Sequence, residues 1–237
     1  MSALLTIEQV TAGYGSQNVL HNVSLEVAEG GLTAIIGPNG HGKTTLLRAI
    51  SGLVNLRAGR ISLAGKPLVG LRPDEIVAAG IVHVPQGDML FPEMTMLENL
   101  LMGAYLPAAS AEAPRRLEKV FTLLPKLKDR RSQVASTLSG GERRMVGIGR
   151  GLMAGGRLLM LDEPSLGLAP FVIDQIYEVV SELAAAGHSI LVVEENAARV
   201  AGKAALIALL DNGELVWSGA GAELMARPEI LETYLGA

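Results

Sequence analysis

The stretch GPNGHGKT, from Gly37 to Thr44, decides the fold of this chain. It lies between the apolar run Leu32–Ile36, which predicts a strand, and Lys43–Ser51, whose spacing of apolar residues predicts a helix. The stretch matches G-x-x-x-x-G-K-[ST] without a gap, and its glycines allow backbone N–H groups to approach phosphate oxygens at a helix N-terminus. We expect Lys43 to reach the β- and γ-phosphates of a nucleoside triphosphate and the Thr44 hydroxyl to bind Mg²⁺. A glycine-rich turn that happens to carry a Lys-Thr pair is the alternative interpretation.

A second motif, LLMLDEP from Leu158 to Pro164, places two acids at the end of an apolar strand. Ligands of parallel sheets gather at the carboxyl ends of the strands, so these acids are expected beside the phosphate loop. Asp162 suits Mg²⁺, through a water molecule, and Glu163 suits the general base for an attacking water. Without the first motif, a strand that ends in Asp-Glu would be interpreted as a solvated turn.

A third motif, LSGGE from Leu138 to Glu142, opens a helix that runs toward Met153. Ser139 is a favoured N-cap residue, and the two glycines after it expose backbone N–H groups at the positive end of the helix dipole. The motif therefore predicts an anion-binding helix start. Ser-Gly-Gly also occurs in plain loops, so the position of the motif shortly before the strand that carries Asp162 is what makes it informative.

The composition of the 237 residues excludes several classes of protein. Hydrophobic residues make up 49% and charged residues 19%, which excludes a disordered chain. The net charge of −4 offers no basic surface of the kind that nonspecific DNA binding needs, so no nucleic-acid partner is expected. The sequence has no cysteine and no apolar run near the roughly 20 residues of a membrane span. Its start, MSALLTIEQV, does not resemble a signal peptide.

The pattern along the chain predicts an α/β core with a helical insertion. Strands are expected at Leu4–Val10, Val19–Val27, Leu32–Ile36, Arg60–Leu63, Ile81–Val84, Leu158–Leu161, Ser189–Val193, Ala204–Leu210 and Glu214–Ser218. Helical patterns cover Met96–Met153, Phe171–Ala185 and Ala222–Leu235, with a break in the last of them before Pro228. We therefore expect one domain over residues 1–237, with a mainly parallel sheet in a core of residues 1–87 and 155–237 and a helical lobe at 88–154.

Taken in order, these motifs resemble the ATP-binding-cassette (ABC) family over essentially the whole chain. The matching features are an aromatic residue near the N-terminus (Tyr14), Walker A (Gly37–Thr44), a glutamine in HVPQG (Gln86), the signature LSGGE (Leu138–Glu142), Walker B (Leu158–Asp162), the adjoining Glu163 and a D-loop (Ser165–Leu168). The resemblance implies an α/β P-loop NTPase cassette with a RecA-like mixed-sheet core, an N-terminal antiparallel β subdomain and an inserted α-helical subdomain. It also implies an ABC-type ATPase whose cofactors are ATP and Mg²⁺.

The resemblance assigns roles to single residues. Tyr14 would stack on adenine, although a tyrosine in a turn is also typical of an ordinary surface residue. Gln86 would sense Mg²⁺ and the attacking water, and the signature would contact the γ-phosphate held by a second cassette in a head-to-tail dimer. The implied catalytic residues are Glu163, Gln86, Lys43 and Glu195, and the metal ligands are Thr44, Gln86 and Asp162. The implied nucleotide contacts are Tyr14, Gly37, Pro38, Asn39, Gly40, His41, Gly42, Lys43, Thr44, Thr45, Ser139, Gly140, Gly141 and Glu142.

Three further segments resemble the shorter of the two ATP-binding subunits of branched-chain amino-acid importers. They are LFPEMTMLENL (Leu90–Leu100), LDEPSLGLAP (Leu161–Pro170) and VEEN (Val193–Asn196). An importer for urea, amides or other amino acids is the nearest alternative. A soluble ABC-type ATPase that acts on DNA or ribosomes is a more distant one, because long coiled-coil insertions and tandem cassettes are absent from this chain.

The importer resemblance implies partners and a location. The partners are integral membrane permease subunits, a second ABC ATPase subunit that is either a copy of this chain or a longer relative, and, indirectly, a periplasmic or extracellular solute-binding protein. The chain would then lie peripherally on the cytoplasmic face of the cell membrane. Met89–Met96 would lie near the groove that receives the permease, where methionine adapts well to apolar contacts, although core filling is an equal alternative for each methionine.

The sequence departs from the family pattern at three places. Glu195 stands where most cassettes have a switch histidine and the branched-chain subunits a glutamine, and an ionised carboxylate there repels a γ-phosphate. We expect that Glu195 turns away, is protonated near the phosphates, or slows hydrolysis, which keeps a regulator with little catalysis open as a function. Arg143 and Arg144 follow the signature, and at least one of them is expected to be solvated or paired. His41 occupies a variable position of the phosphate loop, where it either adds a phosphate contact or, as we expect, points outward.

Overall fold

The computed structural model describes residues 3–87 and 89–235. Its strands are β1 (Ala3–Tyr14), β2 (Gln17–Ala28), β3 (Gly31–Ile36), β4 (Leu56–Leu63), β5 (Lys66–Pro67), β6 (Ile81–Val84), β7 (Leu158–Asp162), β8 (Ser189–Glu194), β9 (Leu206–Asp211) and β10 (Glu214–Gly219). Its helices are α1 (Lys43–Ile50), α2 (Pro73–Ala79), α3 (Met96–Leu101), η1 (Met102–Ala104), α4 (Pro107–Ala111), α5 (Ala113–Leu123), α6 (Pro125–Lys128), η2 (Ala135–Thr137), α7 (Gly140–Ala154), α8 (Pro170–Ala185), η3 (Ala197–Arg199), α9 (Gly221–Met225), α10 (Pro228–Ile230) and η4 (Leu231–Leu235).

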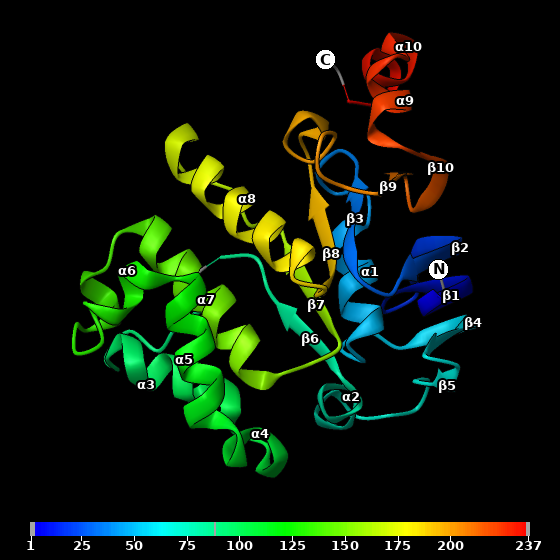
Figure 1. Ribbon diagram of the computed structural model, residues 1–237. Helices are drawn as coiled ribbons and strands as arrows, with labels where there is room; N and C mark the ends of the chain where they lie inside the picture. Colours follow the sequence, from blue (N-terminus) through cyan, green and yellow to red (C-terminus); the bar gives the residue numbers. More distant parts are fainter. Residues whose placement is uncertain (1–2, 88, 236–237) are drawn as a thin grey trace.

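The strands form two sheets. One has six strands in the order β10-β9-β3-β8-β7-β6, in which β10 alone runs antiparallel to its neighbour. The other has four antiparallel strands in the order β2-β1-β4-β5. Figure 1 shows the six-stranded sheet between the four-stranded sheet on one side and the green helices α3–α7 on the other. This arrangement confirms the predicted fold class, including its mainly parallel central sheet.

The central strands are apolar on both faces because both faces are covered. Leu158 and Met160 of β7 belong to the core cluster beneath one face, while Leu159 and Leu161 belong to the cluster beneath the other. The side chains of β8 alternate in the same way. Such continuous apolar runs are typical of parallel strands that are buried on both sides. Helix α8 covers the second face with apolar side chains that include Ile176.

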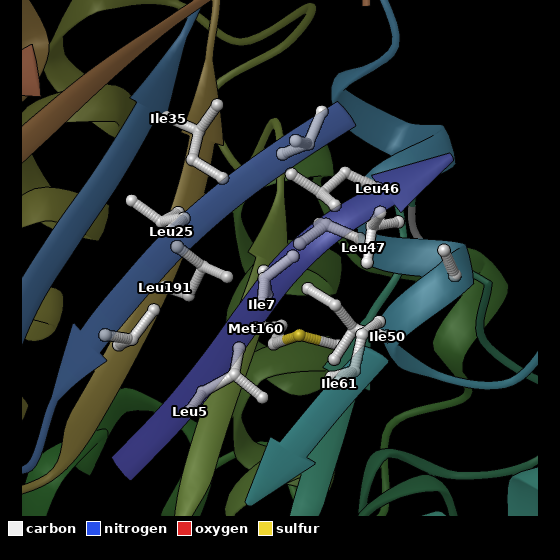
Figure 2. Packing of buried hydrophobic residues seen from close by; sticks show 14 of the residues in the cluster. Leu5, Ile7, Leu25, Ile35, Leu46, Leu47, Ile50, Ile61, Met160 and Leu191 are labelled. Atoms are coloured by element: carbon white, nitrogen blue, oxygen red, sulfur yellow. The ribbon is translucent and has the colours of Figure 1, made fainter. Parts of the chain in front are cut away.

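Helix α1 is held between the two sheets, and this fixes the position of the phosphate loop. Figure 2 shows Leu46, Leu47 and Ile50 of α1 packed among side chains of both sheets, such as Ile7 and Leu191. Each of these three α1 side chains is completely buried. Burying a leucine or isoleucine contributes about 1.5–3 kcal/mol, so the three together stabilise the placement of the helix strongly. The loop at the helix N-terminus therefore has a rigid base.

The helices between β6 and β7 build a core of their own. Buried side chains of α3, α5 and α7, among them Leu100, Val120 and Val146, form a third hydrophobic cluster. Thr95 caps α3 by accepting a hydrogen bond from the backbone N–H of Glu98. Within the described residues, no helix is long and apolar enough to cross a membrane. The predicted lobe begins at residue 88, which lies outside the described residues, so its bounds stay a prediction.

Some predicted elements differ in extent from the observed ones. Strand β1 continues past the predicted end at Val10 and through Gly13 to Tyr14. A Cβ at Gly13 would lie only 2.0 Å from the Gln17 carbonyl oxygen, so the close pairing of the two strands requires glycine at this position. Glycine thus serves here as a close-approach residue within the β1–β2 hairpin, not as a strand end. Helix α2 and strand β5 are short, and neither was predicted. The predicted terminal helix is broken before Pro228, as expected, into α9, α10 and a π-helical turn.

Candidate functional site

The chemically active side chains lie at one edge of the six-stranded sheet. Strands β3, β6, β7, β8 and β9 are mutually parallel, so their carboxyl ends meet at this edge. The residues at or within two positions of the ends of these strands include Gly37, Gln86, Glu163, Glu195 and Asp211. The topology therefore brings together groups that lie up to about 170 residues apart in the chain.

The phosphate loop wraps so closely that two of its glycines, Gly37 and Gly42, have little room for a side chain. A Cβ at Gly37 would lie 2.1 Å from the carbonyl oxygen of Leu210, and one at Gly42 would lie 2.9 Å from the Leu20 side chain. Gly42 is also the N-cap of α1, with a left-handed φ of 105° that favours glycine. The loop thus presents backbone N–H groups at a helix N-terminus, which is the arrangement that binds phosphate.

Lys43 lies within the loop and is almost fully buried. Its Nζ atom donates to the carbonyl oxygens of Gly37, at 2.7 Å, and Pro38, at 3.0 Å. The same atom lies 3.2 Å from a carboxylate oxygen of Glu163. A buried ammonium needs such partners, because an unpaired buried charge is costly. Lys43 therefore connects the phosphate loop to the acid that follows β7.

The side chains of Thr44 and Asp162 are hydrogen-bonded to each other next to Lys43. The Thr44 hydroxyl donates to the Asp162 carboxylate across 3.0 Å. Burial, together with the nearby Glu163 carboxylate, raises the pKa of Asp162, while the hydrogen bond from Thr44 acts in the opposite direction. A hydroxyl and a carboxylate are hard oxygen donors of the kind that Mg²⁺ prefers when phosphates supply the rest of its ligands. These residues fit an Mg²⁺-nucleotide.

Glu163 is held by Lys43 on one side and by Gln86 on the other. The Gln86 side-chain amide donates to the second carboxylate oxygen of Glu163 across 3.1 Å. The backbone of Glu163 is left-handed, with φ 44°, which is uncommon for a non-glycine residue and marks a constrained position. Its N–H donates to the carbonyl oxygen of Val193. The predicted base and the predicted sensor of water are therefore in direct contact.

Glu195 lies against the phosphate loop and does not turn away from it. Its carboxylate accepts a hydrogen bond of 3.0 Å from the side-chain amide of Asn39. The expectation that His41 points outward is wrong. The His41 Nδ1 atom lies 2.7 Å from the Asp211 carboxylate, and its backbone oxygen accepts from the N–H of Gly213. The His41 ring therefore contacts the turn Asp211–Gly213 at the end of β9, and no sequence pattern near His41 predicts that contact.

Tyr14 lies at the end of β1, with nearly half of its surface exposed. Its hydroxyl accepts a hydrogen bond of 3.2 Å from Arg48 of α1. The exposed ring therefore stands beside the helix that begins at the phosphate loop. The predicted stacking on a base stays a prediction.

The signature segment forms the N-terminus of α7. Ser139 is the N-cap and forms a capping box with Glu142, as predicted for its hydroxyl. Partial burial acts to raise the pKa of Glu142, but the hydrogen bonds from Ser139 and the charge of Arg130 lower it on balance. A Cβ at Gly141 would lie 2.4 Å from the Val172 side chain of α8, so a larger residue there would have to displace that side chain or one of the two helices. Within residues 3–87 and 89–235, no hydrogen bond or ion pair joins Ser139–Glu142 to the phosphate loop.

The expectation that at least one of Arg143 and Arg144 is solvated or paired holds, since Arg143 donates to the carbonyl oxygen of Leu138 at 2.7 Å. Arg144 is buried, and it donates to the carbonyl oxygen of Gly87 at 2.8 Å and to that of Leu166 at 3.5 Å, so it joins α7 to the segments after β6 and β7. Glu194 is buried at the end of β8, next to Glu195. No role was predicted for Glu194. The available signal was that it directly follows four apolar residues in one strand, so it is buried and needs partners.

Comparisons with known proteins agree with this geometry. The family model described as ABC transporter matches residues 20–166. A high-affinity branched-chain amino acid transport ATP-binding protein of Pseudomonas aeruginosa, BraG, is 40% identical, and the match covers 98% of this chain and 100% of the relative. A lipopolysaccharide export system ATP-binding protein of Acidithiobacillus ferridurans is 32% identical over 100% of this chain and 98% of its own. Among solved structures, the ADP conformation of an ATP-binding cassette of an ABC transporter is similar, with a TM-score of 0.86, 32% identity and 98% coverage of both chains.

Proposed function

Because this chain belongs to the ABC transporter family and is an ABC-type ATPase, we propose that it powers an importer of branched-chain amino acids. The observation that carries the proposal is the 40% identity to the Pseudomonas aeruginosa relative, which extends over nearly the whole of both chains. The segments Leu90–Leu100, Leu161–Pro170 and Val193–Asn196, which resemble the shorter branched-chain subunit, support it. The full-length similarity to a lipopolysaccharide export ATP-binding protein makes export the second candidate.

In this proposal the chain docks on membrane permease subunits through the segment that leads from β6 into the helical lobe. Five large apolar side chains of this segment are between 41% and 66% exposed: Met89, Phe91, Leu101, Met102 and Tyr105. Exposed apolar side chains that gather on one segment favour an interaction surface. Methionine and aromatic residues are well suited to such contacts. The chain would then act as a peripheral subunit at the cytoplasmic face of the membrane.

The contacts at the sheet edge support a hydrolytic role for each side chain. In this proposal Lys43 neutralises charge on the transferred phosphate, and Thr44 and Asp162 would hold Mg²⁺. Glu163 takes the proton of the attacking water while Gln86 orients that water. Mg²⁺ supplies neutralisation of phosphate charge when it is bound. A positioned general base contributes about 10²- to 10⁴-fold to the rate, so Glu163→Gln should lose that factor and still bind ATP.

Within the described residues, Ser139–Glu142 make no hydrogen bond or ion pair with the phosphate loop of their own chain. We therefore propose that they act at the ATP of a second subunit. Ser139 and the glycines after it form an anion-binding helix start. We expect Glu163→Gln to accumulate as a dimer with ATP and to stay monomeric with ADP in size-exclusion chromatography. An ATP-loaded variant that remains monomeric at high concentration contradicts the paired arrangement of two copies.

Uptake by living cells tests the transported solute. The coding sequence is deleted in the host, the cells are supplied again with the wild-type chain or with Glu163→Gln, and the uptake of radiolabelled leucine and urea is measured. The proposal expects leucine uptake to fall on deletion and to return with the wild-type chain alone. Normal leucine uptake in the deletion strain would refute the proposed solute, and a loss of urea uptake in the same strain would replace it by urea.

A further inference from the structure

The acid that ends β8 lies in a buried polar network outside the roles assigned above. The network consists of Glu194, Ser165, Tyr177 and Arg199, from β8, the segment after β7, α8 and η3. One Glu194 carboxylate oxygen accepts from the Ser165 hydroxyl and from the Tyr177 hydroxyl, each at 2.6 Å. The other accepts from the Arg199 guanidinium at 3.1 Å. Arg199 also donates to the Ser165 hydroxyl, which therefore both accepts and donates.

Burial makes this network rigid. Glu194, Ser165 and Tyr177 are each 1–2% exposed, and only Arg199 reaches the surface. A carboxylate in such surroundings needs charge-assisted hydrogen bonds, because leaving it unpaired there is costly. Burial, followed by the Glu194 charge, raises the pKa of Tyr177 well above its usual range, so the phenol keeps its proton and remains a donor. The four side chains therefore hold one arrangement.

The network lies directly beside the catalytic edge. Ser165 follows Glu163 by two residues, and the Leu166 N–H donates to the Glu163 carbonyl oxygen. The N–H of Glu163 donates to Val193, the residue before Glu194. The backbone at Glu163 is left-handed, a conformation that persists only where the surroundings impose it. The short segment that carries the base is therefore fixed at both ends, by the hydrogen bond from Ser165 to Glu194 and by the backbone hydrogen bond from Glu163 to Val193.

We propose that Glu194 is a positioning residue for hydrolysis, which acts through Ser165 to hold the Glu163 carboxylate in place between Lys43 and Gln86. The proposal rests on the proposed role of Glu163 as the general base. It requires that weakening the Ser165 contact reduces turnover and leaves nucleotide binding intact. Among the described residues, the phosphate loop is joined to the network by one backbone hydrogen bond, from the Gly37 N–H to the Glu194 carbonyl oxygen, and removal of the Ser165 hydroxyl leaves that bond in place. Displacement of a catalytic group by about 1 Å costs up to about 100-fold in rate.

The test compares Ser165→Ala with the wild-type chain in steady-state ATPase assays. This variant removes one hydroxyl and leaves Glu194 paired with Tyr177 and Arg199, so the fold should survive. We expect kcat to fall between about 10- and 100-fold, with KM for ATP within about twofold of the wild type. The matched control is Ser181→Ala on α8, whose hydroxyl donates only to the Tyr177 carbonyl oxygen of its own helix, and its kcat should not change.

A double-mutant cycle separates positioning of the base from a merely structural role. In single-turnover assays, Ser165→Ala added to Glu163→Gln should cause no further loss, because the group it positions is already gone. An equal loss in both backgrounds, or an unchanged kcat in Ser165→Ala, overturns the proposal. Glu194→Gln, which keeps the side-chain shape and loses the ion pair with Arg199, should lower kcat in the same direction by a smaller factor. Wild-type hydrolysis by Glu163→Gln would instead refute the base itself, so the two failures are distinguishable.

Discussion

The buried pair of Lys43 and Glu163 gives the sharpest prediction for the nucleotide-free protein. Their side chains are 3% and 7% exposed, and the charged atoms lie 3.2 Å apart. Lys43→Met keeps the apolar stem but leaves the Glu163 carboxylate with Gln86 as its remaining side-chain partner. Removing one partner of a buried ion pair costs about 3–5 kcal/mol. In a chain of this size the cost corresponds to a fall of about 6 to 20 °C in Tm.

Unfolding by urea without nucleotide measures this effect, since bound nucleotide would add stability of its own. Glu163→Gln should be less destabilised than Lys43→Met, because the ammonium keeps the carbonyl oxygens of Gly37 and Pro38. The double variant Lys43→Met/Glu163→Gln should recover part of the loss, with a coupling of about 1–3 kcal/mol. Lys66→Met, at an exposed position of β5, is the control and should change stability by less than about 0.5 kcal/mol. A Lys43→Met loss below about 1 kcal/mol, or additive effects in the double variant, would refute the reasoning.

Three further predictions concern the acid beside the phosphate loop, the signature helix and a buried histidine. Glu195→Gln should keep the contact with Asn39 and raise kcat roughly fivefold, because a like charge near the γ-phosphate is removed; an unchanged ATPase rate would show that Glu195 does not limit turnover. Gly141→Ala should lower ATPase activity by pushing α7 away from Val172, and Val172→Ala should restore it; failure of this rescue in the double variant would contradict the steric explanation. Burial, followed by the Arg48 charge, lowers the pKa of His83 to about 4. The unfolded chain therefore binds a proton at this histidine more tightly than the folded chain does. As a result, the free energy of unfolding falls as the pH drops from about 6.5 toward 4. In urea unfolding, His83 should lower the free energy of unfolding by about 2 kcal/mol at pH 5 relative to pH 7. If the His83→Gln variant shows the same pH dependence as the wild type, His83 is not the responsible group.

The buried surroundings of His83 explain why the ring resists protonation. The Ser51 hydroxyl already donates to the Leu47 carbonyl oxygen, so it accepts from His83 Nδ1, which therefore carries the proton of the neutral ring. The Nε2 atom is buried and has no hydrogen-bond partner in the part of the chain that the structure describes. A second proton there would place a charge in apolar surroundings without an acceptor.

Much of the fold and of the candidate site was predictable from local patterns. The strand before Gly37, the helix after it, and the acids at the end of β7 follow from short-range spacing, because apolar periodicity and glycine conformation act within a few residues. The N-cap at Ser139 is local in the same sense, and the structure confirms it. Parallel pairing of β3, β7 and β8 then places those local signals at one edge.

The sequence alone therefore determined which residues form the glycine-rich loop, the acidic strand end and the capped helix start, since each of these motifs specifies its own local geometry. Only the tertiary structure decided the partners of the polar groups between the motifs. His41 turns to Asp211, Arg144 reaches two loop carbonyls, and Glu194 is buried among hydroxyls from elements up to 29 residues away. Such pairings arise because a buried polar group must be satisfied by whatever the packing brings to it. No pattern within a segment encodes which distant neighbour that will be.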